Sequence, residues 1–292
     1  MRAMSALHRA VPAVLAVASV VLAIASLHPS RSEEQRPLPA EASGANCQRA
    51  IFRVAVDVGH TVKVPGAMSA RGTPEYAFNL DLGQNVAAAL VEAGFTTTDL
   101  LITDQPPPLG LFVRANRANA MRADLFISIH HDSVPDNLIE TWEYDGQQHG
   151  YNDHYPGYAI FISDDNINRA GSLSFGKFLG TALQARGLGY TPHYTLPIMG
   201  HRRRELVDAD AGVYRYDALV VLRKARMPAV LLEAGSIVNR QEEPQLASPE
   251  RRALMSAAVT AAVEDFCAAR QHPKIEQPVK HRDIAGASAA AR

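Results

Sequence analysis

The sequence predicts an α/β fold, a single domain with a mostly parallel central sheet and helices on both of its faces. Three observations support this prediction. Short β-branched apolar runs alternate along the chain with longer segments whose apolar residues recur at helical spacing. These runs are nearly continuous, as expected for strands that are buried on both faces. No internal repeat interrupts the order, so we expect one domain at residues 47–270.

The predicted elements begin with a strand at residues 51–59, because "IFRVAVDVG" is rich in β-branched residues and ends in glycine. Residues 74–94 follow as a helix, with proline at the first position, apolar residues at helical spacing and glycine at the end. The alternation then continues as strand, helix, strand, strand and helix at residues 95–103, 111–123, 124–130, 157–163 and 172–188.

The last part of the domain contains two strands and a long helix. Residues 218–235, "ALVVLRKARMPAVLLEAG", are predicted to form a short strand and then a buried strand that ends at Gly235. Residues 248–271 are predicted to form the final helix, with Ser248 as N-cap and Pro249 at the first helical position.

The segments outside the domain have the composition of export and linker sequences. Residues 1–27 start with the positively charged "MRAMSALHR" and continue with an uncharged apolar run. This layout is typical of a cleaved signal peptide, but the run is also just long enough for an uncleaved membrane anchor. Residues 28–46 are predicted to be a linker and residues 271–292 a disordered tail. In either case the body of the protein is expected to be exported, periplasmic or secreted.

Two cysteines are consistent with an exported protein. Cys47 precedes the first predicted strand, and Cys267 lies in the last predicted helix. Exported proteins keep disulfides, and a bridge between these residues would join the two ends of the domain. A pair of unrelated buried thiols is the alternative.

The charge balance excludes one class of partner. The formal net charge of −1 provides no basic surface for nucleic acid. Contact with a membrane is expected only through residues 1–27, if they stay uncleaved. The one local basic run, "HRRRE" at residues 201–205, is interpreted as a solvated loop, with an anion-binding patch as the alternative.

Polar side chains stand where the predicted strands end. His60 follows the first strand, His130 ends "DLFISIH", and Glu233 ends "MPAVLLE"; Glu75 opens the first helix. Ligands of open α/β sheets bind beyond the carboxyl ends of the strands, so we expect a metal site there. Two histidines and a carboxylate with one open position are a known ligand set for catalytic zinc. Each histidine taken alone is more often structural, and the joint occurrence favours a site.

The motifs around these residues resemble the zinc-dependent N-acetylmuramoyl-L-alanine amidases, which cleave the bond between muramic acid and the stem peptide of peptidoglycan. "VAVDVGH" followed by "GAMSARGTPEYAFNLDLG" is similar to the family's opening zinc motif. "LFVRANRANAMRADLFISIHHDS" is similar to the middle motif, and "VYRYDALVVLRKARMPAVLLEAGSIVNRQEE" to the closing motif. The three motifs stand in the family's order and cover most of the domain.

The resemblance implies one Zn²⁺ per chain, with His60, Glu75 and His130 as ligands and Glu233 as the catalytic residue. Zinc would polarise the amide carbonyl, and Glu233 would take the proton of the attacking water and return it to the leaving amine. Neighbouring residues of a strand face opposite sides, so His131 is expected to be structural. A role for His131 in orienting substrate is the alternative.

Three further residues stand near the implied ligands. Asp57 and Asn79 are candidates to support them by hydrogen bonds. Asn79 lies four residues after Glu75, so these two residues share a helix face. A cap and a surface polar residue are the alternative for Asp57 and Asn79. Thr61 stands where the family usually has glycine, which predicts a tighter or differently placed loop.

The loop at residues 134–158 is long, and it starts directly after the implied ligand His130. Several relatives carry a regulatory helix near this point, which covers the site until a partner moves it. The resemblance therefore implies peptidoglycan as substrate and an activating protein that acts on the loop after His131. Glu140, His149 and His154 are candidates to fill the open metal position; a plain surface loop or part of the substrate groove is the alternative.

Two other functions are kept as alternatives to the amidase. A zinc peptidase acting on wall or other peptides could use the same ligands and the same water chemistry. A non-catalytic wall-binding protein could keep the fold, but it would have no need of Glu233.

Overall fold

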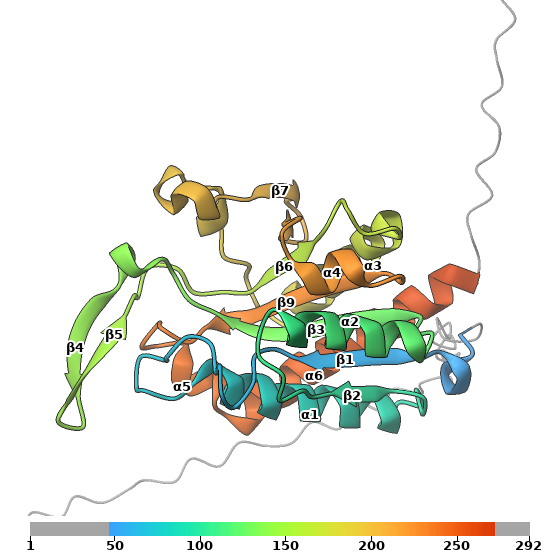
Figure 1. The fold of residues 1–292 in the computed structure, drawn as a ribbon, viewed down its shortest axis with the longest axis horizontal. Helices are drawn as coiled ribbons and strands as arrows, with labels where there is room; N and C mark the ends of the chain where they lie inside the picture. Colours follow the sequence, from blue (N-terminus) through green and yellow to red (C-terminus); the bar gives the residue numbers. More distant parts are fainter. Residues whose placement is uncertain (1–46, 272–292) are drawn as a thin grey trace, which may run out of the picture. The chain divides into compact units, whose positions relative to one another are not determined.

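A seven-stranded sheet forms the centre of the part of the chain that the computed structural model describes, residues 47–271 (Figure 1). The strand order is β2-β1-β3-β9-β6-β8-β7. These strands span Val54–Val58 (β1), Asp99–Leu101 (β2), Leu125–Asp132 (β3), Ala159–Ile162 (β6), Glu205–Asp208 (β7), Val213–Arg215 (β8) and Ala229–Ser236 (β9). Four pairings are parallel, and only β6 with β9 and β7 with β8 are antiparallel. The predicted mostly parallel sheet is confirmed.

Helices cover both faces of this sheet, as predicted. One face carries α1 (Glu75–Glu92), α3 (Arg169–Gln184) and α6 (Pro249–Gln271), and the other carries α2 (Leu109–Ala120) and α4 (Val220–Lys224). Successive residues of β1 divide between the two cores: Val54 and Val56 pack in the cluster that contains Val86 of α1, and Ala55 packs in the cluster that contains Ala118 of α2. Because both faces of β1 are buried, its sequence shows no alternation of apolar and polar residues.

The start of residues 218–235 is helical, so the short strand predicted there is wrong. Val221 and Leu222 of α4 are buried in the same cluster as Ala118 of α2. A short apolar run of this length fits a strand or a buried helical turn equally well, and packing against α2 decides between them here.

Residues 134–158 contain a hairpin that the sequence analysis treated as loop. β4 (Glu140–Tyr144) and β5 (Gln147–Tyr151) form a separate antiparallel two-stranded sheet, which projects beyond one end of the main sheet in Figure 1. Asp145 and Gly146 connect the strands, and both have left-handed backbone conformations, with φ of 52° and 73°. An Asp-Gly pair is a strong sequence signal for such a two-residue turn, so the hairpin was predictable.

Short helical turns complete the described fold. They are η1 (Arg49–Ile51), η2 (Asp136–Leu138), η3 (His193–Thr195), η4 (Pro197–Arg202) and α5 (Glu243–Leu246). The predicted start of α6 is confirmed, because Ser248 Oγ accepts a hydrogen bond from the Arg251 backbone N–H at 3.1 Å.

The two ends of the domain are linked covalently. Cys47 and Cys267 form a disulfide with their Cα atoms 5.3 Å apart, as the cysteine count predicted. The predicted signal peptide or anchor at residues 1–27, the linker at 28–46 and all but the first residue of the predicted tail lie outside the described residues. Among the helices within residues 47–271, none has the length and hydrophobicity needed to cross a membrane.

Candidate metal centre

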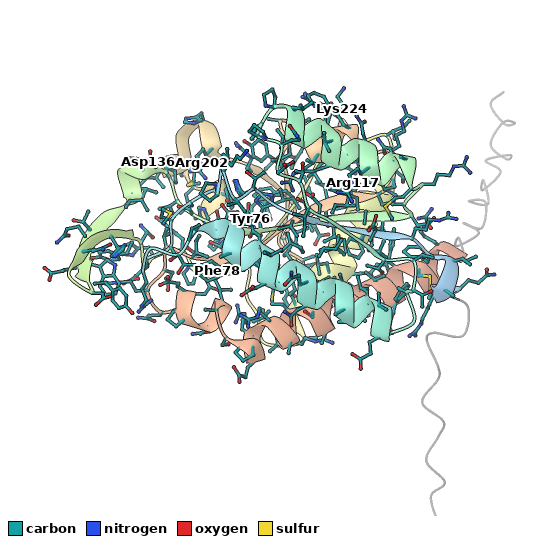
Figure 2. All side chains as sticks on the ribbon, turned by 60° about the horizontal axis from the view of Figure 1, so that its bottom comes forward. Tyr76, Phe78, Arg117, Asp136, Arg202 and Lys224 are labelled. Carbon is teal, nitrogen blue, oxygen red and sulfur yellow. A yellow bond between two sulfur atoms is a disulfide. The ribbon has the colours of Figure 1, made fainter. Side chains whose placement is uncertain are left out.

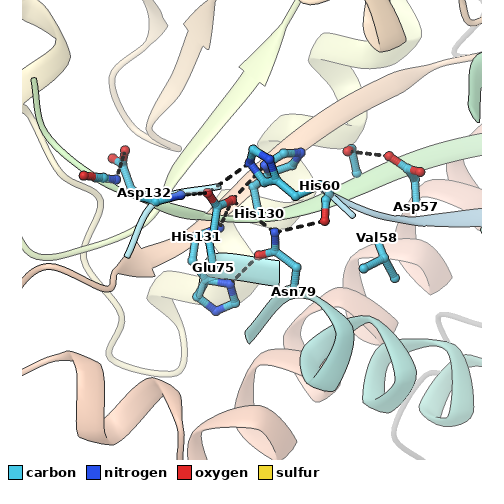
Figure 3. Close-up of polar contacts among 12 residues, drawn as sticks. Asp57, Val58, His60, Glu75, Asn79, His130, His131 and Asp132 are labelled. Carbon is cyan, nitrogen blue, oxygen red and sulfur yellow. Dashed lines mark hydrogen bonds and ion pairs between the residues drawn. The ribbon is translucent and has the colours of Figure 1, made fainter. Parts of the chain in front are cut away.

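Two histidines and a glutamate meet at the carboxyl ends of the central strands (Figure 3). His60 follows β1, His130 lies near the end of β3, and Glu75 is the first residue of α1. His60 Nε2 and His130 Nδ1 each lie 3.0 Å from an oxygen of the Glu75 carboxylate. The ligand atoms of the three residues lie within 4.8 Å of one another. The structure therefore brings together the three residues that the sequence analysis selected as ligands.

Two glycines allow these side chains to approach the backbone closely. A Cβ atom at Gly59 would overlap the imidazole of His130, and a Cβ at Gly66 would overlap the carboxylate of Glu75. Gly66 also has a left-handed backbone conformation, with φ of 82°, which glycine adopts at no steric cost. A larger residue at either position would push the ligand atoms apart.

The backbone of His60 is held by a buried arginine. His60 itself is left-handed, with φ of 66°, an unusual conformation for a residue other than glycine. Arg114 of α2 donates to the carbonyl oxygens of Val58 and His60 and to Asp57 Oδ1, the last at 2.8 Å. Ser128 donates to the other oxygen of Asp57, at 2.8 Å. Asp57 is buried and supports His60 through Arg114. The sequence did not indicate a role for Arg114.

Thr61 closes the turn that follows His60. Its side chain is buried, and its hydroxyl accepts a hydrogen bond from the Val64 backbone N–H at 3.0 Å. The Thr61 N–H in turn donates to the Val64 carbonyl at 3.1 Å. A glycine would lack the hydroxyl, so this chain stabilises its turn with a side chain.

Asn79 and His131 also support Glu75, and the backbone N–H of His131 donates to Glu75 Oε1 at 3.3 Å. Asn79 Nδ2 donates to Glu75 Oε1 at 3.0 Å and to the Gly59 carbonyl at 3.3 Å. The Asn79 carbonyl oxygen can only accept, so His131 Nδ1 donates to it, at 2.8 Å. Burial lowers the pKa of His131 to about 3, so its ring is neutral. Figure 3 shows the His131 ring pointing away from His130, in agreement with a structural role.

The charge state of Glu75 suits a metal ligand. Burial alone would raise the pKa of this carboxyl, but hydrogen bonds from His130 and His60 outweigh burial and hold the pKa well below its usual range. An ionised carboxylate beside two imidazoles is the donor set that zinc binds, because metal ligands must be deprotonated.

Glu233 has the opposite environment from Glu75. It lies on β9 directly beside His130 of β3, and partners in a parallel register point to the same side of the sheet. Its Oε2 is buried and has no hydrogen-bond partner among the described residues. Burial, followed by the charges of Asp132 and Glu75, raises the pKa of Glu233 well above its usual range. A carboxyl group whose pKa lies well above its usual range is suited to general acid–base chemistry.

A cavity of about 340 Å³ opens over these groups. The three candidate ligands and Glu233 line it, together with Tyr194, whose hydroxyl donates to Asp132 Oδ1 at 2.6 Å. Burial raises the pKa of Asp132 to about 7. Two arginines of the basic run, Arg202 and Arg204, also line the cavity. The sequence had indicated a solvated loop for this run, with an anion-binding patch as the alternative, and Tyr194 was missed because it lies in a segment without regular periodicity.

The three residues of the 134–158 segment named as candidates for the open metal position do not line this cavity. Glu140 accepts a hydrogen bond from the Tyr151 hydroxyl at 2.9 Å, and the His149 ring packs against Gly72. His154 is exposed. Only the start of the 134–158 segment reaches the cavity, at Val134 and Asp136. These three side chains therefore do not reach the candidate ligands.

Comparisons with known proteins agree with the motifs. The sequence profile of a family described as N-acetylmuramoyl-L-alanine amidase matches residues 54–265. An N-acetylmuramoyl-L-alanine amidase of Mycobacterium tuberculosis is 27% identical over 206 residues, which are 70% of this chain and 73% of that protein. The amidase AmiC of Neisseria meningitidis is 26% identical over 253 residues, which are 82% of this chain and 58% of that protein.

Solved structures share the fold. The N-acetylmuramyl-L-alanine amidase Ami1 of Mycobacterium smegmatis superimposes with a TM-score of 0.58 at 21% identity and covers 75% of this chain and 98% of that one. The catalytic domain of the amidase CwlV of Bacillus (Paenibacillus) polymyxa gives a TM-score of 0.53 at 22% identity, with 74% and 98% covered.

Proposed function

The chain belongs to the N-acetylmuramoyl-L-alanine amidase family, and from this premise we propose which residues carry its reaction. It is a hydrolase that cleaves the amide bond between N-acetylmuramic acid and the L-alanine of the peptidoglycan stem peptide. We propose that one Zn²⁺ per chain is held by His60, Glu75 and His130, and that Glu233 transfers the proton. The observation that carries this proposal is the meeting of three ligand atoms within 4.8 Å of one another, beside a buried carboxyl oxygen that has no partner among residues 47–271.

The donor set fits zinc better than the hard cations. Two imidazole nitrogens and one carboxylate oxygen are ligands that zinc prefers, whereas Mg²⁺ and Ca²⁺ prefer oxygen ligands alone. Glu75 is held ionised, and Asn79 orients it, as is usual for the partners of metal ligands. When bound, zinc would polarise the scissile carbonyl and lower the pKa of the attacking water to about 7.

The two glutamates divide the work because their environments differ. Glu75 is kept ionised by its histidine partners. Glu233 has a raised pKa and a free buried oxygen, so it can accept a proton from the attacking water and then hold it. It returns this proton to the nitrogen of L-alanine as the amide bond breaks, and the peptide leaves as a neutral amine.

Digestion of purified peptidoglycan tests the reaction. New free amino groups on L-alanine, with the glycan intact, identify the amidase. New amino groups on other stem-peptide residues would identify a zinc peptidase instead. Binding to the wall without any cleavage would identify a non-catalytic protein. A zymogram on wall material with and without a chelator shows whether the activity needs a metal.

Metal content tests the ligands separately from activity. We expect elemental analysis to find about one zinc per wild-type chain and little zinc after replacement of His60, Glu75 or His130 by alanine. The matched control is His154→Ala, which removes an exposed histidine outside the cavity and is expected to keep its zinc. Stoichiometric zinc in all three ligand variants would refute the assignment.

We also propose that an activating protein binds the β4–β5 hairpin. The hairpin is a separate two-stranded sheet, and the chain that leads into it lines the cavity at Val134 and Asp136. Movement of the hairpin would therefore shift one wall of the cavity. Replacing residues 139–152 by a short turn tests this proposal. We expect unchanged zinc content and altered turnover on peptidoglycan; an unaltered turnover would identify the hairpin as ordinary surface.

We propose that the protein acts in the periplasm or outside the cell. Its substrate lies outside the cytoplasmic membrane, and the Cys47–Cys267 disulfide is typical of exported proteins. Residues 1–27 are proposed to act as a signal peptide, with an uncleaved anchor as the alternative. N-terminal sequencing of the exported protein distinguishes the two outcomes.

A further inference from the structure

The structure divides the basic run at residues 201–205 into two sets of side chains. His201, Arg203 and Glu205 are exposed to solvent, as a solvated loop would predict. Arg202 and Arg204 are half-buried and line the same cavity as Glu233. Figure 2 shows the labels of Arg202 and Asp136 close together, on the side of the molecule where the first turn of α1 carries Tyr76. The side chains alternate because the chain passes from η4 into the extended start of β7.

Both arginines have hydrogen-bond donors left over. Arg202 Nη2 donates to the Ser133 carbonyl at 3.3 Å. Arg204 Nη1 donates to the carbonyls of His201 and Arg203, at 2.9 and 2.8 Å, and its Nε is buried without a partner. Within residues 47–271 both guanidinium groups bond only to carbonyl oxygens and neither forms an ion pair. A guanidinium offers five N–H donors, so both can still bind a carboxylate.

Arg204 is also held in position before any ligand arrives. Its guanidinium carbon lies 3.6 Å from the ring centroid of Tyr216, a close cation–π contact. Tyr216 packs edge-on against Phe161 of β6, with ring centroids 5.9 Å apart, and both aromatic residues line the cavity. An arginine already fixed on an aromatic wall loses little conformational entropy on binding. This arrangement is unlike a solvated side chain.

Acidic groups also line this cavity, among them Asp136. Asp132 and Glu233 lie on the strands beneath it, beside the candidate zinc ligands. The charge of Arg202 lowers the pKa of both acids, but Arg202 forms no ion pair with either of them among the described residues. Hydrogen-bond donors of both arginines therefore remain available to an anion from outside the chain.

We propose that Arg202 and Arg204 form a carboxylate-binding subsite for the stem peptide, which holds the free α-carboxylate of the glutamate that follows L-alanine. This inference rests on the proposed function. Once the lactyl carboxyl of muramic acid is part of the scissile amide, the glycan carries no charge there, and the nearest free carboxylate lies on the peptide. Two extended residues span about 7 Å, and the candidate ligands and both arginines line the same cavity of about 340 Å³.

The test compares two muropeptides that differ only in whether this α-carboxyl is free or amidated. We expect wild-type kcat/KM to be about 10- to 100-fold higher on the free acid, the range for hydrogen bonds to charged groups. Arg202→Gln and Arg204→Gln should each lower kcat/KM on the free acid about 10-fold and change the amidated substrate by no more than about 2-fold. Arg203→Gln, from the exposed set, is the matched control and should change neither.

Binding provides a readout that does not need turnover. Calorimetry of the zinc-loaded enzyme with the free stem peptide, which is the reaction product, should show a similar loss of affinity in Arg202→Gln and Arg204→Gln. Arg202→Lys and Arg204→Lys should restore part of this affinity, because lysine keeps the charge but not the planar guanidinium. Equal wild-type affinity for the free and amidated peptides would overturn the subsite. So would variants that lose activity on both muropeptides alike, since that result indicates an effect on Glu233. Failure of the proposed function would give a different result, because neither muropeptide would then release a peptide that begins with L-alanine. In that case the binding measurement would still decide whether the subsite exists.

Discussion

Replacing Asn79 by alanine removes the amide that connects Glu75 to His131. In the wild-type protein this amide donates to Glu75 Oε1 at 3.0 Å and to the Gly59 carbonyl at 3.3 Å, and it accepts from His131 at 2.8 Å. The variant leaves the Gly59 carbonyl and the His131 N–H buried without partners. It also frees Glu75 to rotate away from the orientation in which it meets both histidines.

The structure sets the size of both effects. A buried group left unpaired costs about 1–3 kcal/mol, so two such groups should lower the free energy of unfolding of the metal-free protein by about 2–6 kcal/mol. Loss of a group that orients a metal ligand usually lowers metal affinity about 10- to 100-fold, which is about 1.4–2.8 kcal/mol of binding free energy. Zinc stabilises only the native state, so the loaded variant should show the larger stability deficit.

Two measurements check this prediction. Competition with a chromogenic chelator gives the zinc affinity, and urea unfolding with and without zinc gives the stability. The control is Asn85→Ala on the same helix, because Asn85 is exposed and its amide donates only to the Asp81 carbonyl, at 2.7 Å. That variant should keep its zinc affinity and lose less than about 0.5 kcal/mol. Wild-type zinc affinity in Asn79→Ala would refute the proposed support of Glu75.

Three further outcomes are expected. Glu233→Gln should keep its zinc and lose about two to four orders of magnitude in turnover, the scale for a general acid–base group; near wild-type turnover would show that another group carries the proton. The double variant Cys47→Ala/Cys267→Ala removes a disulfide that joins residues with a sequence separation of 220. By the chain-entropy model, urea unfolding should show a loss of up to about 5 kcal/mol in the free energy of unfolding. An unchanged unfolding midpoint would contradict this prediction. Burial lowers the pKa of His193 to about 4 in the folded protein, compared with about 6.5 in the unfolded chain. The neutral ring therefore contributes its full stability at pH values above about 6.5. This contribution is lost as the pH falls from about 6.5 toward 4, because the unfolded chain then binds a proton that the folded protein does not. The stability difference between wild type and His193→Gln should therefore shrink by about 1.4 kcal/mol per pH unit over that window, and a constant difference would count against it.

The sequence by itself determined the order of most elements and the residues of the candidate centre. Continuous β-branched runs predict strands buried on both faces, and β1, β3 and β9 form where such runs occur. His60, His130 and Glu233 could be selected because parallel strands bring their carboxyl ends to one edge, whatever the loops between them do. The even cysteine count similarly predicted the disulfide at the ends of the domain.

Only the tertiary structure decided which neighbours these residues have. Arg114 reaches Asp57 across 57 positions of sequence, and Arg204 stacks on Tyr216 from a segment with no regular period. Within one basic run, Arg202 faces the cavity while Arg203 faces solvent. Periodicity along a chain reports which face of an element is apolar, but a polar side chain gains its partner from an element elsewhere in the sequence. Sheet order and helix packing determine that partner, and neither can be read from local spacing.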